Sequence, residues 1–299
     1  MLDIVYYPVS AVLKAWHSLF ALAFGPASAV AWVLAIVFLV ITFRAALIPV
    51  ALRQTRTQAA MLRLRPRVDA LKAKYPDDPR TLATETQALY REQGVRPLAG
   101  CLPLLGQALV FFGLFHVLRS FDRTHAVGQL PFQATAAPMS AEQNARTPNY
   151  LFEADGVRAF LDAHVFGAPL SATLAGQPTV PMMLVAGALV LAAAVATHFT
   201  ARGAAARQTA AQPALLTTLT LWVFPAGLLI GGPLLPVAIL VYWVANNGWT
   251  LGQQYLVHRR VDAETAVAAP VSASRATAPK PGAKPVRGQR TQTTRRARK

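Results

Sequence analysis

Apolar residues in this chain gather in long runs. The first runs unbroken from Ala29 to Ile41 and resumes at Ala45 after a single charged residue, Arg44. A run of this length crosses a hydrocarbon layer about 30 Å thick as one helix. We therefore predict a membrane span over residues 29–52 with a charge inside it, bent or loosened at Pro49 because proline lacks the backbone N–H that a helix needs.

Four more spans follow from the same pattern. Residues 98–118 and 180–201 are each long enough for one span, and between Ala214 and Val257 there is no Asp, Glu, Lys or Arg in 44 residues. As one helix this last segment would be about 66 Å long, more than twice the hydrocarbon thickness. It is expected to fold back at the turn signal Gly231–Pro233, giving spans over residues 214–232 and 233–257.

The segment between the first two spans, residues 53–97, carries ten basic and five acidic residues, which favours a cytoplasmic position. Apolar residues follow steps of three and four along it, typical of a helix seam that turns back near residues 75–79, so we predict a helical hairpin. Pro66 is expected to kink the first arm or to open a fresh helix. A plain connector with solvated charges is the alternative. The seam residues are Met61, Leu64, Val68, Leu71 and Tyr75.

Residues 1–28 predict an amphipathic helix in the outer membrane interface, with Lys14, His17 and Ser18 on its polar side. Its apolar residues recur at helical spacing, namely Val12, Leu13, Trp16, Leu19, Phe20 and Ala23. The start carries Asp3 and no positive stretch, which argues against a cleavable signal peptide.

The remaining segments complete the topology. Residues 119–179 have a net charge near −1 up to Pro178 and are expected outside, with one short helix near residues 156–166. Residues 202–213 form a short cytoplasmic loop. The tail, 258–299, holds eleven basic and two acidic residues after His258, lacks large apolar residues, and is expected to be disordered. The N-terminus is thus predicted outside and the C-terminus in the cytoplasm.

Composition supports a polytopic all-α membrane protein: 54% of residues are hydrophobic, 14% are charged and the mean hydropathy is +0.36. The single Cys101 excludes an intramolecular disulfide. No phosphate loop, dinucleotide fingerprint or metal-ligand spacing occurs, so we expect no enzyme activity, no cofactor and no metal site. No acidic residue lies within any predicted span, which argues against ion-coupled transport because that chemistry relies on intramembrane carboxylates.

Arg44 is therefore the charge that needs an explanation. Its cost at the bilayer centre is estimated at about 3 to well over 10 kcal/mol. One reading is that its side chain extends toward the basic side of the membrane. The other is that it faces a water-filled cavity among several helices, as buried membrane charges usually do.

Three motifs resemble the YidC-type membrane protein insertases, most closely their actinobacterial branch. They are ThrPheArgAlaAlaLeuIlePro at residues 42–49, the hairpin end and second span at 89–107, and TyrTrpValAlaAsnAsnGlyTrpThrLeuGlyGlnGln at 242–254. They occur in order on the predicted spans, and the resemblance covers roughly residues 4–258. The external loop is longer than the short connection common in that family.

The resemblance implies five transmembrane helices around a hydrophilic groove that opens to the cytoplasm and sideways to lipid. It implies that the groove-lining residues are Arg44, Gln107, Trp243, Asn246 and Asn247. The function implied is insertion of nascent proteins into a bacterial plasma membrane and help with their folding, without covalent chemistry. The partners are nascent membrane proteins, the ribosome at the basic tail 259–299 and hairpin 53–97, anionic lipids, and, as a further candidate, the Sec translocon.

Two other classes of function remain open at this point. An anion channel would use Arg44 as its selectivity charge and would need a continuous pore. A passive anchor for ribosomes or an assembly factor would depend on the basic tail and not on Arg44. The absence of intramembrane carboxylates weighs against the first, and the polar residues within apolar spans weigh against the second.

Overall fold

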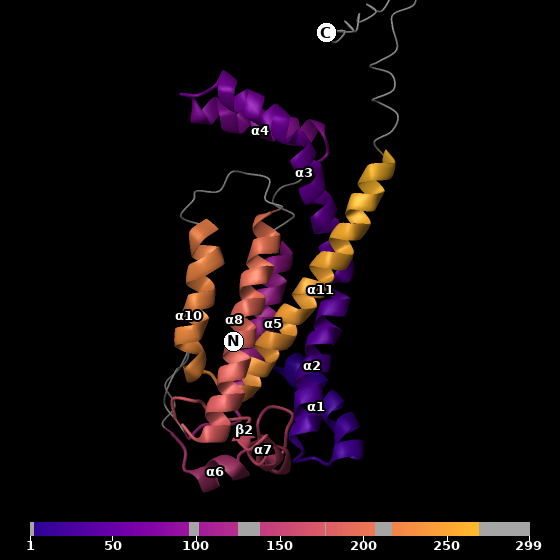
Figure 1. Ribbon diagram of the computed structural model, residues 1–299. Coiled ribbons are helices and arrows are strands. Elements are labelled where there is room, and N and C mark those ends of the chain that lie inside the picture. Colours follow the sequence, from indigo (N-terminus) through magenta and orange to yellow (C-terminus); the bar gives the residue numbers. More distant parts are fainter. Residues whose placement is uncertain (1–2, 96–101, 125–137, 177, 207–216, 269–299) are drawn as a thin grey trace, which may run out of the picture. The chain divides into compact units, whose positions relative to one another are not determined.

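The computed structural model describes residues 3–95, 102–124, 138–176, 178–206 and 217–268. These residues are mostly helical, as the sequence predicts (Figure 1). Residues 1–258 form one compact unit, and a second unit begins at Arg259. The described part of the second unit, residues 259–268, is the end of a helix.

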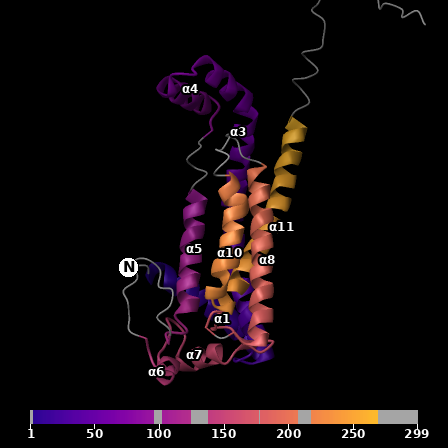
Figure 2. The same ribbon diagram turned by 60° about the vertical axis from the view of Figure 1, so that its left-hand side comes forward.

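Five helices run side by side in the first unit, the last of them up to His258 (Figures 1 and 2). They are α2 (Ala29–Ala46), α5 (Leu102–Arg119), α8 (Val180–Ala205), α10 (Phe224–Gly231) and α11 (Val237–Ala268). Among the described residues, α2 and α8 are each long and apolar enough to cross a membrane, while α5 and the α10 segment contain shorter apolar helices. Five spans therefore stay a prediction.

The first predicted span is divided in the structure. Helix α2 ends at Ala46, and α3 (Ile48–Lys74) begins after Leu47 with Pro49 in its first turn. A proline is tolerated there because the first-turn N–H has no partner within a helix. Pro66 neither ends α3 nor starts a new helix, since α3 continues through it.

Helices α3 and α4 (Pro79–Glu92) form a helical hairpin (Figure 1). The turn between them ends at Asp78, whose carboxylate caps α4 by accepting hydrogen bonds from Thr81 N (3.0 Å) and Thr81 Oγ1 (2.6 Å). Such a cap satisfies one of the free N–H groups of the first turn.

A π-helical turn, η2 (Leu219–Val223), precedes α10, and the chain then reverses through the 3-10 turn η3 (Gly232–Leu234) into α11. A glycine is needed at position 232 because a Cβ there would lie 2.8 Å from Cγ2 of Val190 on α8. The reversal is therefore packed directly against the neighbouring helix.

The segment after α5 folds at the end of the helices opposite the α3–α4 hairpin (Figures 1 and 2). It contains α6 (Ala141–Arg146), α7 (Ala154–Leu161) and a two-stranded antiparallel pair, β1 (His164–Val165) and β2 (Ala168–Pro169). Two backbone N–H groups at the start of α11 donate to this segment, Val237 to Ala172 O (3.1 Å) and Ala238 to Leu170 O (3.0 Å). The loop thus supplies partners that a helix start lacks.

An aromatic cluster joins the loop to the helices. The Trp32 ring of α2 lies 5.0 Å from the Phe160 ring and 5.4 Å from the Phe152 ring, and Phe121 stacks on Phe160 at 4.3 Å. All four rings are buried. Aromatic pairs at these separations add to the hydrophobic gain from burial, so the cluster fixes the loop on the ends of the helices.

Helix α1 (Asp3–Phe24) packs against α2 and α5. The prediction that His17 lies on its polar side is wrong: His17 is buried and stacks on Trp32 at 3.7 Å, while Leu22 is exposed. The imidazole is accommodated because its Nε2 lies 3.0 Å from Pro26 O, to which the neutral ring donates. Burial lowers the pKa of His17, which favours that neutral form.

Replacing Phe160 by alanine should destabilise the protein by about 3–5 kcal/mol, because the ring is fully buried and its loss leaves a cavity. Phe166→Ala is the matched control in the same loop; this ring is 90% exposed, and its loss should change stability by no more than about 0.5 kcal/mol. Denaturant unfolding of the purified protein in detergent measures both. Equal effects of the two substitutions would contradict the role given to the cluster.

Candidate functional site

Arg44 lies in the last turn of α2 and is buried, with 9% of its surface exposed. Its guanidinium reaches across to α11, where Asn246 Oδ1 accepts from Nε (3.1 Å) and from Nη2 (2.7 Å). Thr250 Oγ1 accepts a third hydrogen bond from Nη2 (2.9 Å). This one side chain joins α2 to α11 through residues that are 202 positions apart in the chain.

The acceptors on α11 are arranged by helix geometry. Asn246 and Thr250 are four residues apart and therefore neighbours on one helix face. Thr250 donates its own hydroxyl hydrogen to Asn246 O (2.8 Å), which leaves the oxygen lone pairs free to accept from Arg44. Both partners are neutral, so the hydrogen bonds hold the guanidinium in place and leave its positive charge uncompensated.

Arg44 also keeps donors free. A guanidinium has five N–H groups, and three hydrogen bonds to Asn246 and Thr250 use those on Nε and Nη2. Within the described part of the chain no acceptor lies in hydrogen-bond range of Nη1. The cavity beside Arg44 measures about 20 Å³, room for about one water molecule. Apart from Arg44 and Asn246, its lining is Leu39, Val40, Phe43, Leu47, Val110 and Tyr242.

Two of the other residues predicted for the site lie away from Arg44, on another face of α11. Trp243 and Asn247 lie one turn apart on a neighbouring face of α11, and Asn247 Nδ2 donates to Trp243 O (3.0 Å). The Trp243 ring lies 5.8 Å from the Phe111 ring of α5 and packs against a small cluster on α8 and α10. Trp243 therefore lies where α5, α8 and α10 approach α11. The side chain of Gln107 lies outside the described residues.

Thr250 is a site residue that the sequence analysis missed. The signal was present: Asn246 and Thr250 stand four residues apart in a predicted apolar span, and this spacing places two polar groups on one helix face. Tyr242, one turn earlier on α11, lines the cavity beside Arg44 and was also missed.

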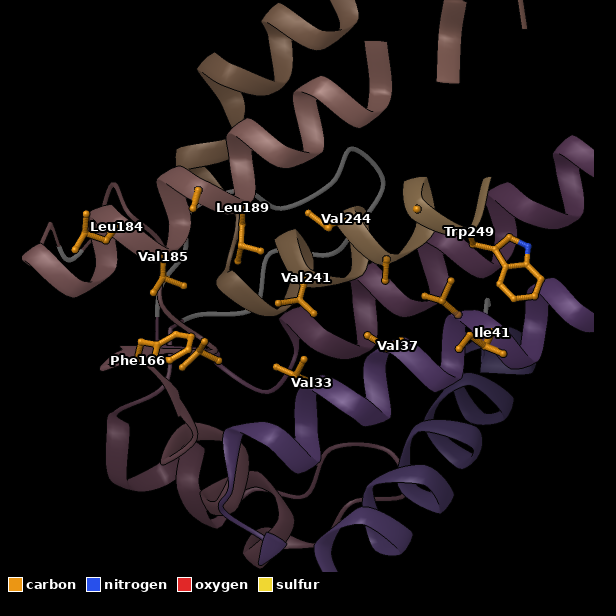
Figure 3. Close-up of a pocket in the computed structure, with 15 residues that line it drawn as sticks. Val33, Val37, Ile41, Phe166, Leu184, Val185, Leu189, Val241, Val244 and Trp249 are labelled. Carbon is orange, nitrogen blue, oxygen red and sulfur yellow. The ribbon is translucent and has the colours of Figure 1, made fainter. Parts of the chain in front are cut away.

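A much larger pocket, about 850 Å³, lies between α2, α8 and α11 and is bounded at one end by Val165 and Phe166 of the loop (Figure 3). None of the predicted site residues lines it. Trp249 lines the pocket, but its indole Nε1 already donates a hydrogen bond to Gln253 Oε1 (2.7 Å) and so is not free to bind a ligand. With such walls the pocket suits hydrocarbon and offers no chemistry of its own.

The hydrogen bonds between α2 and α11 should appear as a coupling energy. In a double-mutant cycle, Arg44→Met and Asn246→Leu should be coupled by about 1–3 kcal/mol, because either single change leaves the other partner unsatisfied within a site that is buried at Arg44 and half-buried at Asn246. Asn247→Leu is the matched control: its amide bonds its own helix, so its coupling to Arg44→Met should stay below about 0.5 kcal/mol. Unfolding in detergent gives the energies, and equal couplings for both asparagines would contradict this geometry.

Comparison with known proteins gives the family. The 60Kd inner membrane protein family matches residues 23–264. The chain is 43% identical to the membrane protein insertase YidC of Mycolicibacterium paratuberculosis, over 96% of this chain and 84% of that one. It is 41% identical to the protein of the same name from Mycobacterium tuberculosis H37Rv (97% and 82% covered) and 30% identical to that of Streptomyces avermitilis (87% and 58%). The resemblance inferred from the sequence is confirmed, and the chain belongs to the 60Kd inner membrane protein family, alongside these actinobacterial YidC insertases.

Proposed function

We propose that this protein is a membrane protein insertase that passes the polar tail of a substrate across the bacterial plasma membrane and releases the apolar helix of that substrate into lipid. The observation that carries the proposal is Arg44. It is a buried cation held by two neutral partners, and the N–H donors on its Nη1 remain available to a substrate. The family membership and the names of the relatives support the same function.

The energetic problem of insertion lies in the polar tail. An apolar helix of about 20 residues enters lipid favourably, but polar groups that precede it lose their water when they cross. Arg44 offers such groups a positive charge and two hydrogen-bond donors partway along the crossing. A carboxylate on the tail gains most, because a hydrogen bond between two charged groups is the strongest kind. A membrane potential that is positive outside then draws each negative charge outward by about 2.3 kcal/mol per 100 mV.

The hydrophilic groove is part of this proposal. The cavity beside Arg44 holds about one water as the side chains stand, so a tail must displace apolar neighbours such as Phe43 and Val110 to enter. Gln107 on α5 and Asn246 and Asn247 on α11 are the amides that would line the widened groove. We propose that the groove opens toward the cytoplasmic end, next to the basic hairpin α3–α4.

The outer end of the groove is proposed to be closed. In support, the loop segment 138–176 packs on the ends of the helices through Phe152 and Phe160 and bonds the first turn of α11 through Leu170 O and Ala172 O. A closed outer end suits an insertase that releases its substrate sideways. It does not suit an anion channel, which needs a continuous aqueous path.

Lateral release is proposed along α5 and the η2–α10 segment. Large apolar side chains are exposed on both, including Phe112 on α5, Trp222 on η2 and Ile230 on α10. Helix α10 packs against α8 and α5 packs against α1, and Trp243 of α11 lies between the two groups. A substrate helix leaving between α5 and α10 would pass this indole and meet apolar surface on either side.

We further propose that the N-terminus lies outside and the C-terminus in the cytoplasm, where basic segments are retained. The hairpin 53–97 would receive the substrate, and the basic tail 259–299 would bind ribosomal RNA or anionic lipid through its phosphates. Cooperation with the Sec translocon belongs to the same proposal. Nearly all of the tail, residues 269–299, lies outside the described residues.

Purified protein in liposomes, given a single-span substrate with an acidic tail, should yield protease-protected product well above empty liposomes. Arg44→Ala should reduce that yield about tenfold or more, since it removes both the charge and its donors. Arg44→Lys keeps the positive charge but loses the planar guanidinium with its several donors, so it should retain most activity if the charge matters more than the shape. Leu256→Ala, at a position of α11 that is 66% exposed and lies outside the proposed groove, is a control for general damage to α11.

The alternatives predict other results. Chloride flux through the same liposomes, lost in Arg44→Ala, would indicate a channel. Activity that survives Arg44→Ala but vanishes when the chain is cut after Arg260 would indicate an anchor. Insertion no better than in empty liposomes would contradict an autonomous insertase.

A further inference from the structure

A small polar pocket lies where α5 ends, α11 begins and the loop segment 171–176 crosses between them. Its volume is about 160 Å³. The loop is held there by a backbone bridge between Thr173 and Pro236 and by a hydrogen bond from Ala175 N to Pro233 O (3.0 Å). The lining residues are Leu118, Arg119, Asp122, Ser171, Thr173, Ala175, Gly176, Leu234 and Pro236. None of them belongs to the site around Arg44.

Arg119 is the cation of this pocket, and the residue is half-buried. The loop side of the protein has four arginines, all of them described. Arg123 donates to Pro148 O and Asn149 Oδ1, and Arg146 and Arg158 form ion pairs with Glu142 and Asp155. Within the described part of the chain no acceptor is in hydrogen-bond range of the Arg119 guanidinium. An arginine stays charged even when half-buried. Asp122 in the same pocket attracts this charge but forms no hydrogen bond with it, so the guanidinium keeps its donors.

The pocket also contains two hydroxyl groups and a carboxylate, from Ser171, Thr173 and Asp122. Ser171 offers a hydroxyl with no partner among the described residues, and Thr173 Oγ1 accepts from Gly176 N (3.1 Å) while keeping its own hydrogen to donate. Asp122 uses Oδ1 to accept from Thr124 N (3.0 Å) and Thr124 Oγ1 (2.6 Å), which leaves Oδ2 available. One guanidinium, two hydroxyls and one carboxylate oxygen therefore share a small space.

We propose that this pocket binds the head group of an aminophospholipid, with the phosphate on Arg119, Ser171 and Thr173 and the ammonium on Asp122. A guanidinium matches two phosphate oxygens at once, and hydroxyls are common additional donors to phosphate. Asp122 makes the pocket electrically balanced, which matches a zwitterion. A purely anionic head group would instead face the Asp122 carboxylate without a compensating charge.

The position of the pocket fits a lipid. This part of the inference rests on the proposed membrane placement, in which Arg119 directly follows the span 98–118 and so lies at head-group level. Leu118 and Leu234 are the largest apolar residues of its wall. Leu234 and Ile230 are exposed, 52% and 80%, along η3 and α10, and provide a surface for the acyl chains below the head group. The pocket is far smaller than the 300–1,000 Å³ typical of sites for whole drug-sized ligands, so it takes the head group alone.

Lipid binding by the delipidated full-length protein, measured by native mass spectrometry in detergent, tests this. Phosphatidylethanolamine should bind, phosphatidylglycerol should bind more weakly, and diacylglycerol, which lacks the phosphate, should not bind at the site. Arg119→Gln should weaken phosphatidylethanolamine binding about tenfold to a hundredfold, the range for hydrogen bonds between charged groups. Arg158→Gln, which removes an equal charge from the loop surface, should bind as the wild type does.

Further variants separate the two halves of the head group. Asp122→Asn should remove the preference for phosphatidylethanolamine over phosphatidylglycerol. Arg119→Lys, which keeps the charge and loses the fork, should bind with intermediate strength and carries the test if Arg119→Gln does not fold. Ser171→Ala should weaken binding by a few-fold, the worth of one hydrogen bond.

Several outcomes would overturn the proposal. They are unchanged phosphatidylethanolamine binding in Arg119→Gln, equal binding of diacylglycerol, and tighter binding of phosphatidylglycerol than of phosphatidylethanolamine by the wild type. Displacement of the lipid by millimolar inorganic phosphate would identify a free-phosphate site instead. The assay scores lipid binding and not insertion, so failure of the insertase proposal would leave its result standing.

Discussion

The structure depends on one interaction, the hydrogen bonding of Arg44 on α2 to Asn246 and Thr250 on α11. It joins α2 to α11 through a charge that neither partner neutralises. A carboxylate in place of Asn246 would bind the guanidinium more strongly and cancel its field. Neutral acceptors instead fix the position of the charge and preserve its attraction for a negative group from outside the chain.

The two ends of the helices differ in a way that suits passage from one side. At one end the aromatic rings of Trp32, Phe121, Phe152 and Phe160 and the hydrogen bonds to the start of α11 tie the loop to the helices. At the other end the chain continues into the basic hairpin α3–α4. Under the proposed function, a substrate enters from the end that carries the hairpin, reaches the Arg44 charge and stops where the loop is packed, so its apolar part leaves sideways.

The mostly helical fold could be predicted because long apolar runs separated by basic or turn-rich segments leave few alternatives. Arg44 was found because a lone charge in an apolar run stands out, and the paired asparagines came from the resemblance. The features that the sequence did not predict correctly are those that depend on contacts between distant parts of the chain. His17 looks polar in sequence, yet its flat ring fills a space against Trp32 and Pro26 satisfies it. The sequence did not predict that the loop packs on the ends of the helices, because Phe152 and Phe160 contact Trp32 only in the folded structure. Thr250 was within reach through its spacing from Asn246.

The central claim is that the Arg44 charge acts on the polar tail of the substrate, and a charge exchange tests it most directly. Insertion into liposomes would be compared for wild type and Arg44→Glu, each with a substrate whose tail carries either Asp or Lys at the same positions. Our account predicts that Arg44→Glu loses insertion of the acidic tail and regains insertion when the tail is basic, without an imposed membrane potential. Equal loss for both tails, with Arg44→Glu still folded, would contradict it.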